Sequence, residues 1–223
     1  MTRLALIRHA PTAWSATGRL QGRADVPLDP RARPDWRLPA ALDGFRVVTS
    51  PLGRAVDTAR LLGVEATVEP LLTEMDWGAW EGETVAGLRA RLGAAMTGAE
   101  AEGLDFRPPG GESPRDVQAR LAPLLRYLAE RGEPTAAITH KGVIRAVFAE
   151  AAGWDMLGKP PVRLSWDAAH LFRLDRDGRP SVEALNLSLI RRPREGGGPG
   201  ATAPSLALGS RLRGNDDGKR SRP

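Results

Sequence analysis

The chain has 223 residues, of which 41% are hydrophobic and 26% are charged, and it contains no cysteine. These values are typical of soluble globular domains, so they exclude a fibrous or wholly unfolded polypeptide. Without cysteine, disulfides, thiolate catalysis and sulfur-bound zinc are excluded as well. The length suits one folded domain with a sizeable core.

The formal net charge of +5 lies in the C-terminal segment. Residues 191–223 carry seven Arg and one Lys against three acidic residues, which accounts for the whole excess. Residues 1–190 are therefore neutral, which argues against a nucleic-acid partner, because nucleic-acid-binding domains usually have a basic face. We predict a folded domain over residues 1–190 and a disordered, Gly/Pro/Arg-rich tail over residues 191–223 that is dispensable for chemistry.

The N-terminal apolar run, residues 4–7, is too short for a membrane span or the core of a signal peptide. We therefore expect a cytoplasmic protein without a membrane partner. The sequence does not fix the oligomeric state, and base rates alone favour a homodimer.

Short apolar runs alternate with segments of helical period, which predicts an α/β fold with a largely parallel sheet. The predicted strands are residues 4–7, 46–49, 135–139, 169–174 and 182–187. One predicted helix is capped by Ser50 with Pro51 in its first position and ends before Gly63, and another runs from Ser113 to near Gly132. Residues 84–102 are a third helical candidate, weakened by three glycines.

Two of the three histidines directly follow predicted strands, His9 after residues 4–7 and His140 after residues 135–139. Ligands of open α/β sheets bind at the carboxyl ends of the strands, so we expect both side chains in one crevice. His170 lies inside a predicted strand and is interpreted as structural.

Arginines accompany these histidines. Arg8 precedes His9, and Arg54 falls in the first turn of the helix after Ser50. Guanidinium groups and helix N-termini both favour phosphate oxygens, so the sequence predicts a phosphate pocket. Arg145, which follows His140, is interpreted as a surface charge or salt-bridge partner.

A general acid is expected in the aromatic and glycine-rich segment of residues 71–82. A carboxyl group near apolar rings has a raised pKa, as a general acid requires. The residue pattern alone leaves Glu74, Asp76 and Glu81 as alternatives. Trp77 and Trp80 are expected to pack in the core or in loops.

Six motifs lie in order between Leu4 and Ser188. They are RHAPT (8–12), GRLQGRADVPL (18–28), TSPLGRA (49–55), Glu74 with WEG (80–82), GGES (110–113) and THKGVIR (139–145). Together they resemble the motifs of the histidine phosphatase (phosphoglycerate mutase-like) superfamily, in particular its small bacterial broad-specificity or alpha-ribazole-phosphatase-like branch.

The resemblance implies a three-layer α/β/α sandwich with a mostly parallel central sheet and a small helical insertion near the active site. It implies that His9 is the nucleophile, that Arg8, Arg54 and His140 hold the phosphoryl oxygens, and that Glu74 protonates the leaving alcohol. The substrate would be a small phosphorylated metabolite, and neither a metal nor another cofactor is implied. Minor substrate contacts are expected from Thr12, Ser15, Gln21 and Gly22.

Three positions depart from the superfamily pattern. Ala10-Pro11 replaces the usual Gly-Glu, which would change the loop if the glycine needs a positive φ. Ser15 replaces Asn and shortens a hydrogen-bonding arm. Lys141 replaces a small residue and adds a charge at the pocket rim, unless it points to solvent.

Two other functions compete with a phosphatase. A phosphoglycerate mutase would pass the phosphoryl group back to its substrate, and a non-catalytic module would bind phosphate without turnover. A metal-dependent phosphatase is disfavoured, since no His/Asp cluster has ligand spacing. Substrate discrimination is expected in residues 84–111, where three arginines either meet an acidic substrate or lie on a solvated helix face: Arg89, Arg91 and Arg107.

Overall fold

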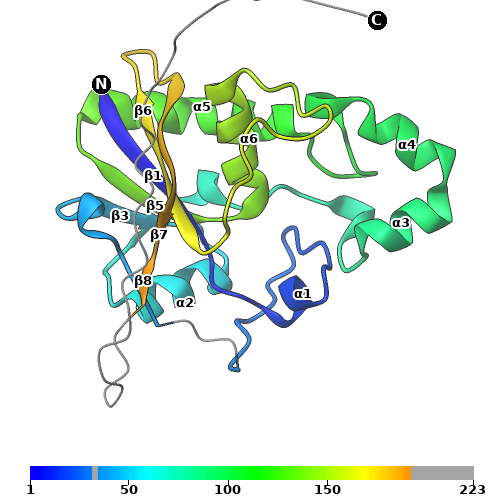
Figure 1. Ribbon diagram of the computed structural model, residues 1–223, viewed down its shortest axis with the longest axis horizontal. Coiled ribbons are helices and arrows are strands. Elements are labelled where there is room, and N and C mark those ends of the chain that lie inside the picture. Colours follow the sequence, from blue (N-terminus) through cyan, green and yellow to red (C-terminus); the bar gives the residue numbers. More distant parts are fainter. Residues whose placement is uncertain (32–34, 192–223) are drawn as a thin grey trace, which may run out of the picture. The chain divides into compact units, whose positions relative to one another are not determined.

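The computed structural model describes residues 1–31 and 35–191, so all but the first residue of the expected disordered tail lies outside the described residues (Figure 1). A six-stranded sheet has the order β4-β3-β5-β1-β6-β7. Its strands are β1 (Thr2–Arg8), β3 (Arg46–Thr49), β4 (Thr67–Val68), β5 (Thr135–Thr139), β6 (Ala168–Leu174) and β7 (Pro180–Ser188). Strands β4, β3, β5 and β1 are parallel, and β6 and β7 add an antiparallel edge. The predicted mostly parallel sheet is confirmed.

Both faces of this sheet are covered, as its apolar strands predict. In β1, Leu4 and Leu6 face helices α5 (Pro114–Arg131) and α6 (Lys141–Ala152), and the alternate residues Ala5 and Ile7 face α2 (Gly53–Leu62). Figure 1 shows α5 and α6 on one side of the strands and α2 on the other. The fold is thus the predicted three-layer α/β/α sandwich.

The remaining elements are short. They are α1 (Ala13–Ala16), α3 (Val85–Leu92), α4 (Ala94–Glu100), the 3-10 helices η1 (Ala40–Leu42), η2 (Pro70–Leu72), η3 (Gly78–Trp80) and η4 (Gly103–Asp105), and a ribbon of β2 (Trp36–Arg37) with β8 (Ile190–Arg191). Among the described residues, no helix is long and apolar enough to cross a membrane.

The helix ends follow local sequence chemistry with one exception. Helix α5 begins at a capping box of Ser113 and Asp116 and ends at Gly132, whose φ is 68°. The prediction for α2 is wrong at its start, because the helix begins at Gly53 with Leu52 as its N-cap. The Ser50 hydroxyl lies 2.7 Å from the His140 ring instead, and accepts only a 3.3 Å bond from the Leu52 amide.

The predicted helix over residues 84–102 is two helices, α3 and α4. Gly93, with φ 52° and ψ −122°, ends the first and precedes the second, a conformation that suits glycine. Leu88 and Met96 pack with Trp80 and Trp77 in a small cluster separate from the main core, which confirms the packing role expected for both tryptophans.

His170 ties the segment before β6 to the sheet. Its Nε2 donates to the Ser165 carbonyl at 3.1 Å, and its Nδ1 accepts from the Asn186 amide at 3.4 Å. Asn186, with φ 60°, also binds the Ser165 amide and the Arg163 carbonyl through its side chain, at 2.7 and 3.1 Å. Residues 163–165 are therefore held to the β6–β7 edge.

We predict that His170→Asn makes stability less dependent on pH. Burial lowers the pKa of His170 to about 4, whereas the unfolded side chain has a pKa near 6.5. The unfolded chain therefore binds this proton more readily, and the native state loses stability as the pH falls from about 6.5 toward 4. Between pH 7.5 and pH 5, the Tm of the variant should fall less than that of the wild type. Parallel Tm profiles for the two proteins would contradict the assignment.

Candidate active site

Strands β1 and β5 place two histidines side by side. Arg8 pairs with Thr139 in the sheet register, and the His9 amide donates to the Thr139 carbonyl at 2.9 Å. The His9 and His140 ring centroids are consequently 5.2 Å apart. Both side chains are buried, with exposed fractions of 3% and 0%. The structure thus brings together the two histidines singled out in the sequence.

Hydrogen bonding fixes the tautomer of His9. Its Nδ1 lies 2.7 Å from the Ala10 carbonyl oxygen. Because a carbonyl can only accept, Nδ1 carries the proton and Nε2 keeps its lone pair. Burial and the neighbouring Arg8 and Arg54 lower the pKa of His9 to about 3. The imidazole is therefore neutral at physiological pH.

The exchange of glycine for Ala10 is accommodated without strain. Ala10 is not among the described residues with a positive φ, so its Cβ carries no left-handed penalty. Its amide donates to the Thr58 hydroxyl at 2.8 Å, which in turn donates to the Arg54 carbonyl at 2.7 Å. The loop after His9 is therefore attached to the helix that carries Arg54.

Arg54 is fully buried, yet part of its guanidinium has no protein partner. Its two terminal nitrogens donate to the carbonyls of Gly22 and Ala24, each at 2.6 Å, while its Nε is unpaired among the described residues. The Nε of Arg8 is likewise buried without a partner. Burial lowers the pKa of both groups, but an arginine retains its charge in proteins.

The ring of His140 also has one nitrogen with a hydrogen-bond partner and one without. Its Nε2 lies 2.7 Å from the Ser50 hydroxyl, and its Nδ1 is buried with no partner among the described residues. Burial, followed by the charges of His9, Arg54 and Arg8, places its pKa well below the usual value. Ser50 was not predicted as a site residue, and the available signal was its position directly after a predicted strand, which it shares with His9 and His140.

The contacts of Glu74 distinguish it from Asp76 and Glu81, the other two candidates for the general acid. Its carboxylate accepts bonds from the Met75 amide at 2.8 Å and the Gly142 amide at 3.0 Å. A Cβ at Gly142 would lie 2.5 Å from Glu74 Oε1, so this approach requires glycine. Burial raises the pKa of Glu74, although these bonds and the charges of Arg54 and Arg8 oppose the rise.

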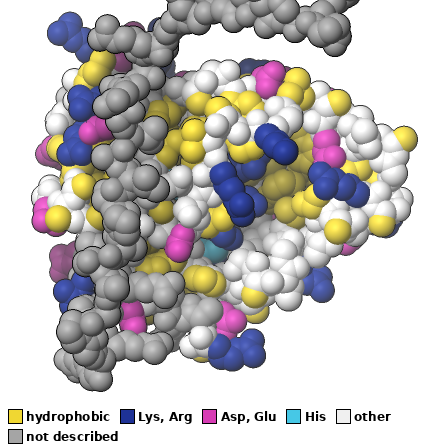
Figure 2. All heavy atoms as spheres, viewed as in Figure 1, with side chains coloured by type: hydrophobic (Ala, Val, Ile, Leu, Met, Phe, Trp, Pro, Cys, Tyr) yellow, Lys and Arg dark blue, Asp and Glu magenta, His cyan; other side chains and the backbone are white. Residues whose placement is uncertain are grey.

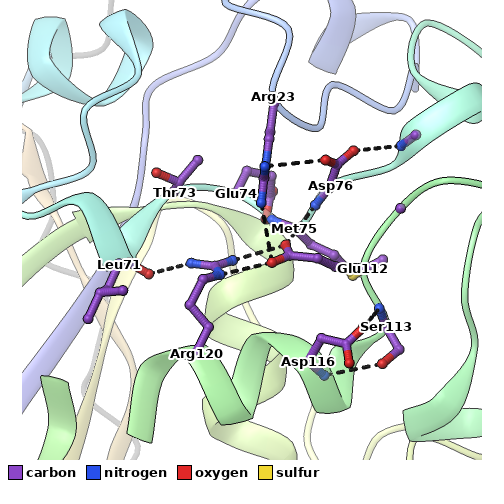
Figure 3. A network of polar contacts seen from close by, with 12 residues as sticks. Arg23, Leu71, Thr73, Glu74, Met75, Asp76, Glu112, Ser113, Asp116 and Arg120 are labelled. Atoms are coloured by element: carbon purple, nitrogen blue, oxygen red, sulfur yellow. Dashed lines mark hydrogen bonds and ion pairs between the residues drawn. The ribbon is translucent and has the colours of Figure 1, made fainter. Parts of the chain in front are cut away.

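The segment carrying Glu74 is fixed by the network in Figure 3. Glu112 accepts from the Asp76 amide at 3.0 Å and from Arg120 at 3.0 Å, and Arg120 also donates to the Leu71 carbonyl. Arg23 contacts Asp76 at 3.4 Å and Glu112 at 3.3 Å. Sequence analysis did not identify Arg120 or Glu112, although Glu112 belongs to the GGES motif.

The four expected minor contacts lie near this centre. Thr12 donates to the Gln21 side chain at 3.0 Å and forms a capping box with Ser15 at the start of α1. Gly22 offers its carbonyl to Arg54, and Glu81 binds the next two amides, of Arg23 and Ala24, at 2.6 and 3.0 Å. The structure therefore assembles these residues, and their contact with a substrate stays a prediction.

Over residues 1–31 and 35–191, no group of three or more His, Asp or Glu side chains is placed to hold a metal ion.

Neutral imidazoles and buried guanidinium groups thus lie together at the carboxyl ends of parallel strands, an arrangement suited to binding an anion. Residues 4–188 match the family model of the histidine phosphatase superfamily, branch 1. The chain therefore belongs to the histidine phosphatase superfamily, as its six motifs predict.

Named relatives agree with this membership. Glucosyl-3-phosphoglycerate phosphatase of Mycobacterium tuberculosis is 33% identical over 179 residues, covering 70% of this chain and 80% of that protein. The 2,3-bisphosphoglycerate-dependent phosphoglycerate mutase 2 of Gloeobacter violaceus is 32% identical over 169 residues, covering 67% and 75%. A solved mycobacterial glucosyl-3-phosphoglycerate phosphatase complexed with VO3 superposes with a TM-score of 0.68 at 27% identity, covering 84% of this chain and all of that one.

We predict that the ring nitrogens of His9 and His140 do not titrate between pH 7.5 and pH 5. The lowered pKa values of both groups keep them neutral in this range, whereas a solvent-exposed histidine would gain a proton near pH 6.5. NMR spectra of protein with 15N-labelled histidine should show constant shifts and an Nδ1–H tautomer for His9. The chain has only three histidines, so His9→Ala and His170→Asn assign the signals. An imidazolium signal from His9 at pH 6 would disprove the assignment.

Proposed function

We propose that this protein is a metal-independent phosphomonoester hydrolase that acts through a phosphohistidine on a small phosphorylated metabolite. The observation that carries the proposal is the His9 ring, whose Nδ1 is bound to the Ala10 carbonyl. This bond leaves the lone pair of Nε2 available for nucleophilic attack. In the first step Nε2 attacks phosphorus, the ester P–O bond breaks and the phosphoryl group stays on His9.

Charge on the phosphoryl oxygens would be met by buried nitrogens that have no hydrogen-bond partner among the described residues. They are the Nε atoms of Arg8 and Arg54 and the Nδ1 of His140. His140 can donate from Nδ1 because its Nε2 then accepts from the Ser50 hydroxyl. Fixed donors aimed at developing charge stabilise the transition state of phosphoryl transfer. The two guanidinium groups supply positive charge that other phosphatases take from a metal ion.

Glu74 would serve both steps. Its raised pKa favours the protonated form, which gives its proton to the leaving alcohol. The resulting carboxylate then accepts a proton from the water that attacks phosphohistidine, so phosphate is released and the acid is restored. The relative named as a glucosyl-3-phosphoglycerate phosphatase supports hydrolysis and a phosphoglycerate-type ester.

A phosphoglycerate mutase is the second candidate, favoured by the relative of that name in Gloeobacter violaceus. It would use the same first step and return the phosphoryl group to a bound phosphoglycerate. Incubation with 3-phosphoglycerate and catalytic 2,3-bisphosphoglycerate separates the two. Formation of 2-phosphoglycerate with little free phosphate would identify a mutase.

The test of the main proposal is phosphate release from a panel of small monoesters in the presence of EDTA. We expect hydrolysis to persist with chelator and to disappear in His9→Ala. Arg54→Gln should lower kcat/KM at least about 100-fold, by loss of a charged transition-state contact. Arg60→Gln is the matched control, because Arg60 lies on the same helix with its side chain 75% exposed, and its activity should equal that of the wild type. Full activity of His9→Ala would refute the mechanism.

We also predict that the cost of Glu74→Gln depends on the leaving group. Gln cannot donate the proton that an alkoxide needs, so kcat for alkyl phosphates should fall about 10²- to 10⁴-fold. Release of p-nitrophenolate needs no proton, and its phosphorylation burst should be much less affected. Equal losses for the two ester classes would show that Glu74 is not the general acid.

A further inference from the structure

A pocket lies beside the candidate active site. It is a cavity of about 180 Å³ between α6 and the segment that follows it, lined in part by Lys141, Arg145, Phe148, Trp154, Arg163 and Trp166. This volume corresponds to about six water molecules at their share of the liquid. Figure 2 shows a face on which Lys and Arg side chains surround a hydrophobic hollow, with the edge of a histidine at its margin.

The cations of this pocket have no acidic partner. Among the described residues, no ion pair involves Lys141, Arg145 or Arg163. Arg145 was expected to be a surface charge or a salt-bridge partner; its guanidinium lies 5.1 Å from the Trp154 ring centroid. Positive charges without an acidic partner in the described part of the chain favour an anionic ligand.

Residues 84–111, where substrate discrimination was expected, differ from the pocket in that their arginines have acidic partners. The three arginines are all in ion pairs, Arg89 with Glu100 at 2.7 Å, Arg91 with Glu83 at 3.2 Å, and Arg107 with Asp116. Their charges are thus neutralised within the protein. By contrast, Lys141 and Arg145, which have no ion pair among the described residues, lie on α6.

Trp166, which lines the pocket, also lies close to a residue of the proposed phosphoryl site. The Arg8 guanidinium lies 5.7 Å and the Lys141 ammonium 5.4 Å from the centroid of this ring. Lys141 also directly follows His140 in the chain. Glu74, the proposed general acid, accepts a hydrogen bond at 3.0 Å from the amide of Gly142, the residue after Lys141. A leaving group protonated by Glu74 would therefore extend toward Lys141.

The pocket is also preformed. Residues 163–165 are held by the side chains of His170 and Asn186, and the Trp166 ring packs edge-on against His170 at 6.4 Å. On the opposite wall, the Trp154 indole donates to the Leu157 carbonyl at 3.0 Å. The aromatic walls therefore offer a rigid surface to the carbon skeleton of a ligand.

We propose that this pocket binds a second anionic group, a carboxylate or a phosphate, on the leaving alcohol of the substrate. Arg145 and Arg163 would pair with its oxygens, and Lys141 would lie between this group and the phosphoryl group. The proposal rests on the proposed function for the phosphoryl site, and it assigns specificity to a lysine that departs from the superfamily motif.

The test uses substrates that differ only at the second group. 3-Phosphoglycerate is compared with glycerol 3-phosphate, phosphoserine with phosphoethanolamine, and fructose 1,6-bisphosphate with fructose 6-phosphate. Affinities are measured by calorimetry on His9→Ala, and kcat/KM on the chain with His9 intact. We expect at least a tenfold preference for the doubly anionic ligand in one pair, and the pair shows whether carboxylate or phosphate is read.

Variants of the pocket residues test which side chains produce the preference for the doubly anionic ligand. Lys141→Gln and Arg163→Gln should each reduce it at least threefold by weakening the doubly anionic ligand more than its partner, whereas Arg60→Gln should preserve it. Phosphate release without any preference would overturn the inference and leave the hydrolase intact. Preferential binding without turnover on any ester would support the pocket and reject the hydrolase. A preference unchanged by both variants would also overturn the inference.

Discussion

The structure depends on keeping positive charge buried beside neutral imidazoles. A buried guanidinium cannot shed its proton, so its desolvation must be offset by surrounding oxygen atoms. For Arg54 this is done by the Gly22 and Ala24 carbonyls and by the carboxyl groups of Glu74, when it is ionised, Asp25 and Glu81. The loop of residues 21–25 is consequently wrapped around Arg54. The same charge, with that of Arg8, opposes protonation of both histidines.

The sequence was sufficient to predict those strands and helices that are marked by local signals such as apolar runs and capping residues. Apolar runs located the strands, two histidines at strand ends located the site, and Ser113 with Gly132 bounded α5. Ser50 shows the limit of this reasoning. A serine after a strand is an equally good helix cap or ring partner, and only the 2.7 Å approach of His140 from another strand decides between them.

Contacts between residues far apart in the sequence could not be predicted from the sequence. The acceptor for His9 is a backbone carbonyl, which no residue type reveals. Arg120 and Arg23 reach Glu112 from a helix and a loop far apart in the sequence. Trp166 lies beside Arg8 in the structure but near the other end of the domain in the sequence. The residues around Arg8 therefore give no sign of this contact. Such pairings are consequences of strand order, since β6 adjoins β1 only in the folded sheet.

The Arg23 side chain links two halves of the site. It belongs to the loop that Arg54 holds, and it also binds the two carboxylates beside Glu74. A displacement of this loop would therefore disturb the surroundings of Arg54 and of Glu74 together. The side chains of Lys141 and Arg163 have no hydrogen bond or ion pair in this network among the described residues. A substitution at Lys141 or Arg163 would therefore leave the hydrogen bonds and ion pairs of Arg23, Glu112 and Arg120 intact, whereas a substitution at Arg23 would break two of these ion pairs.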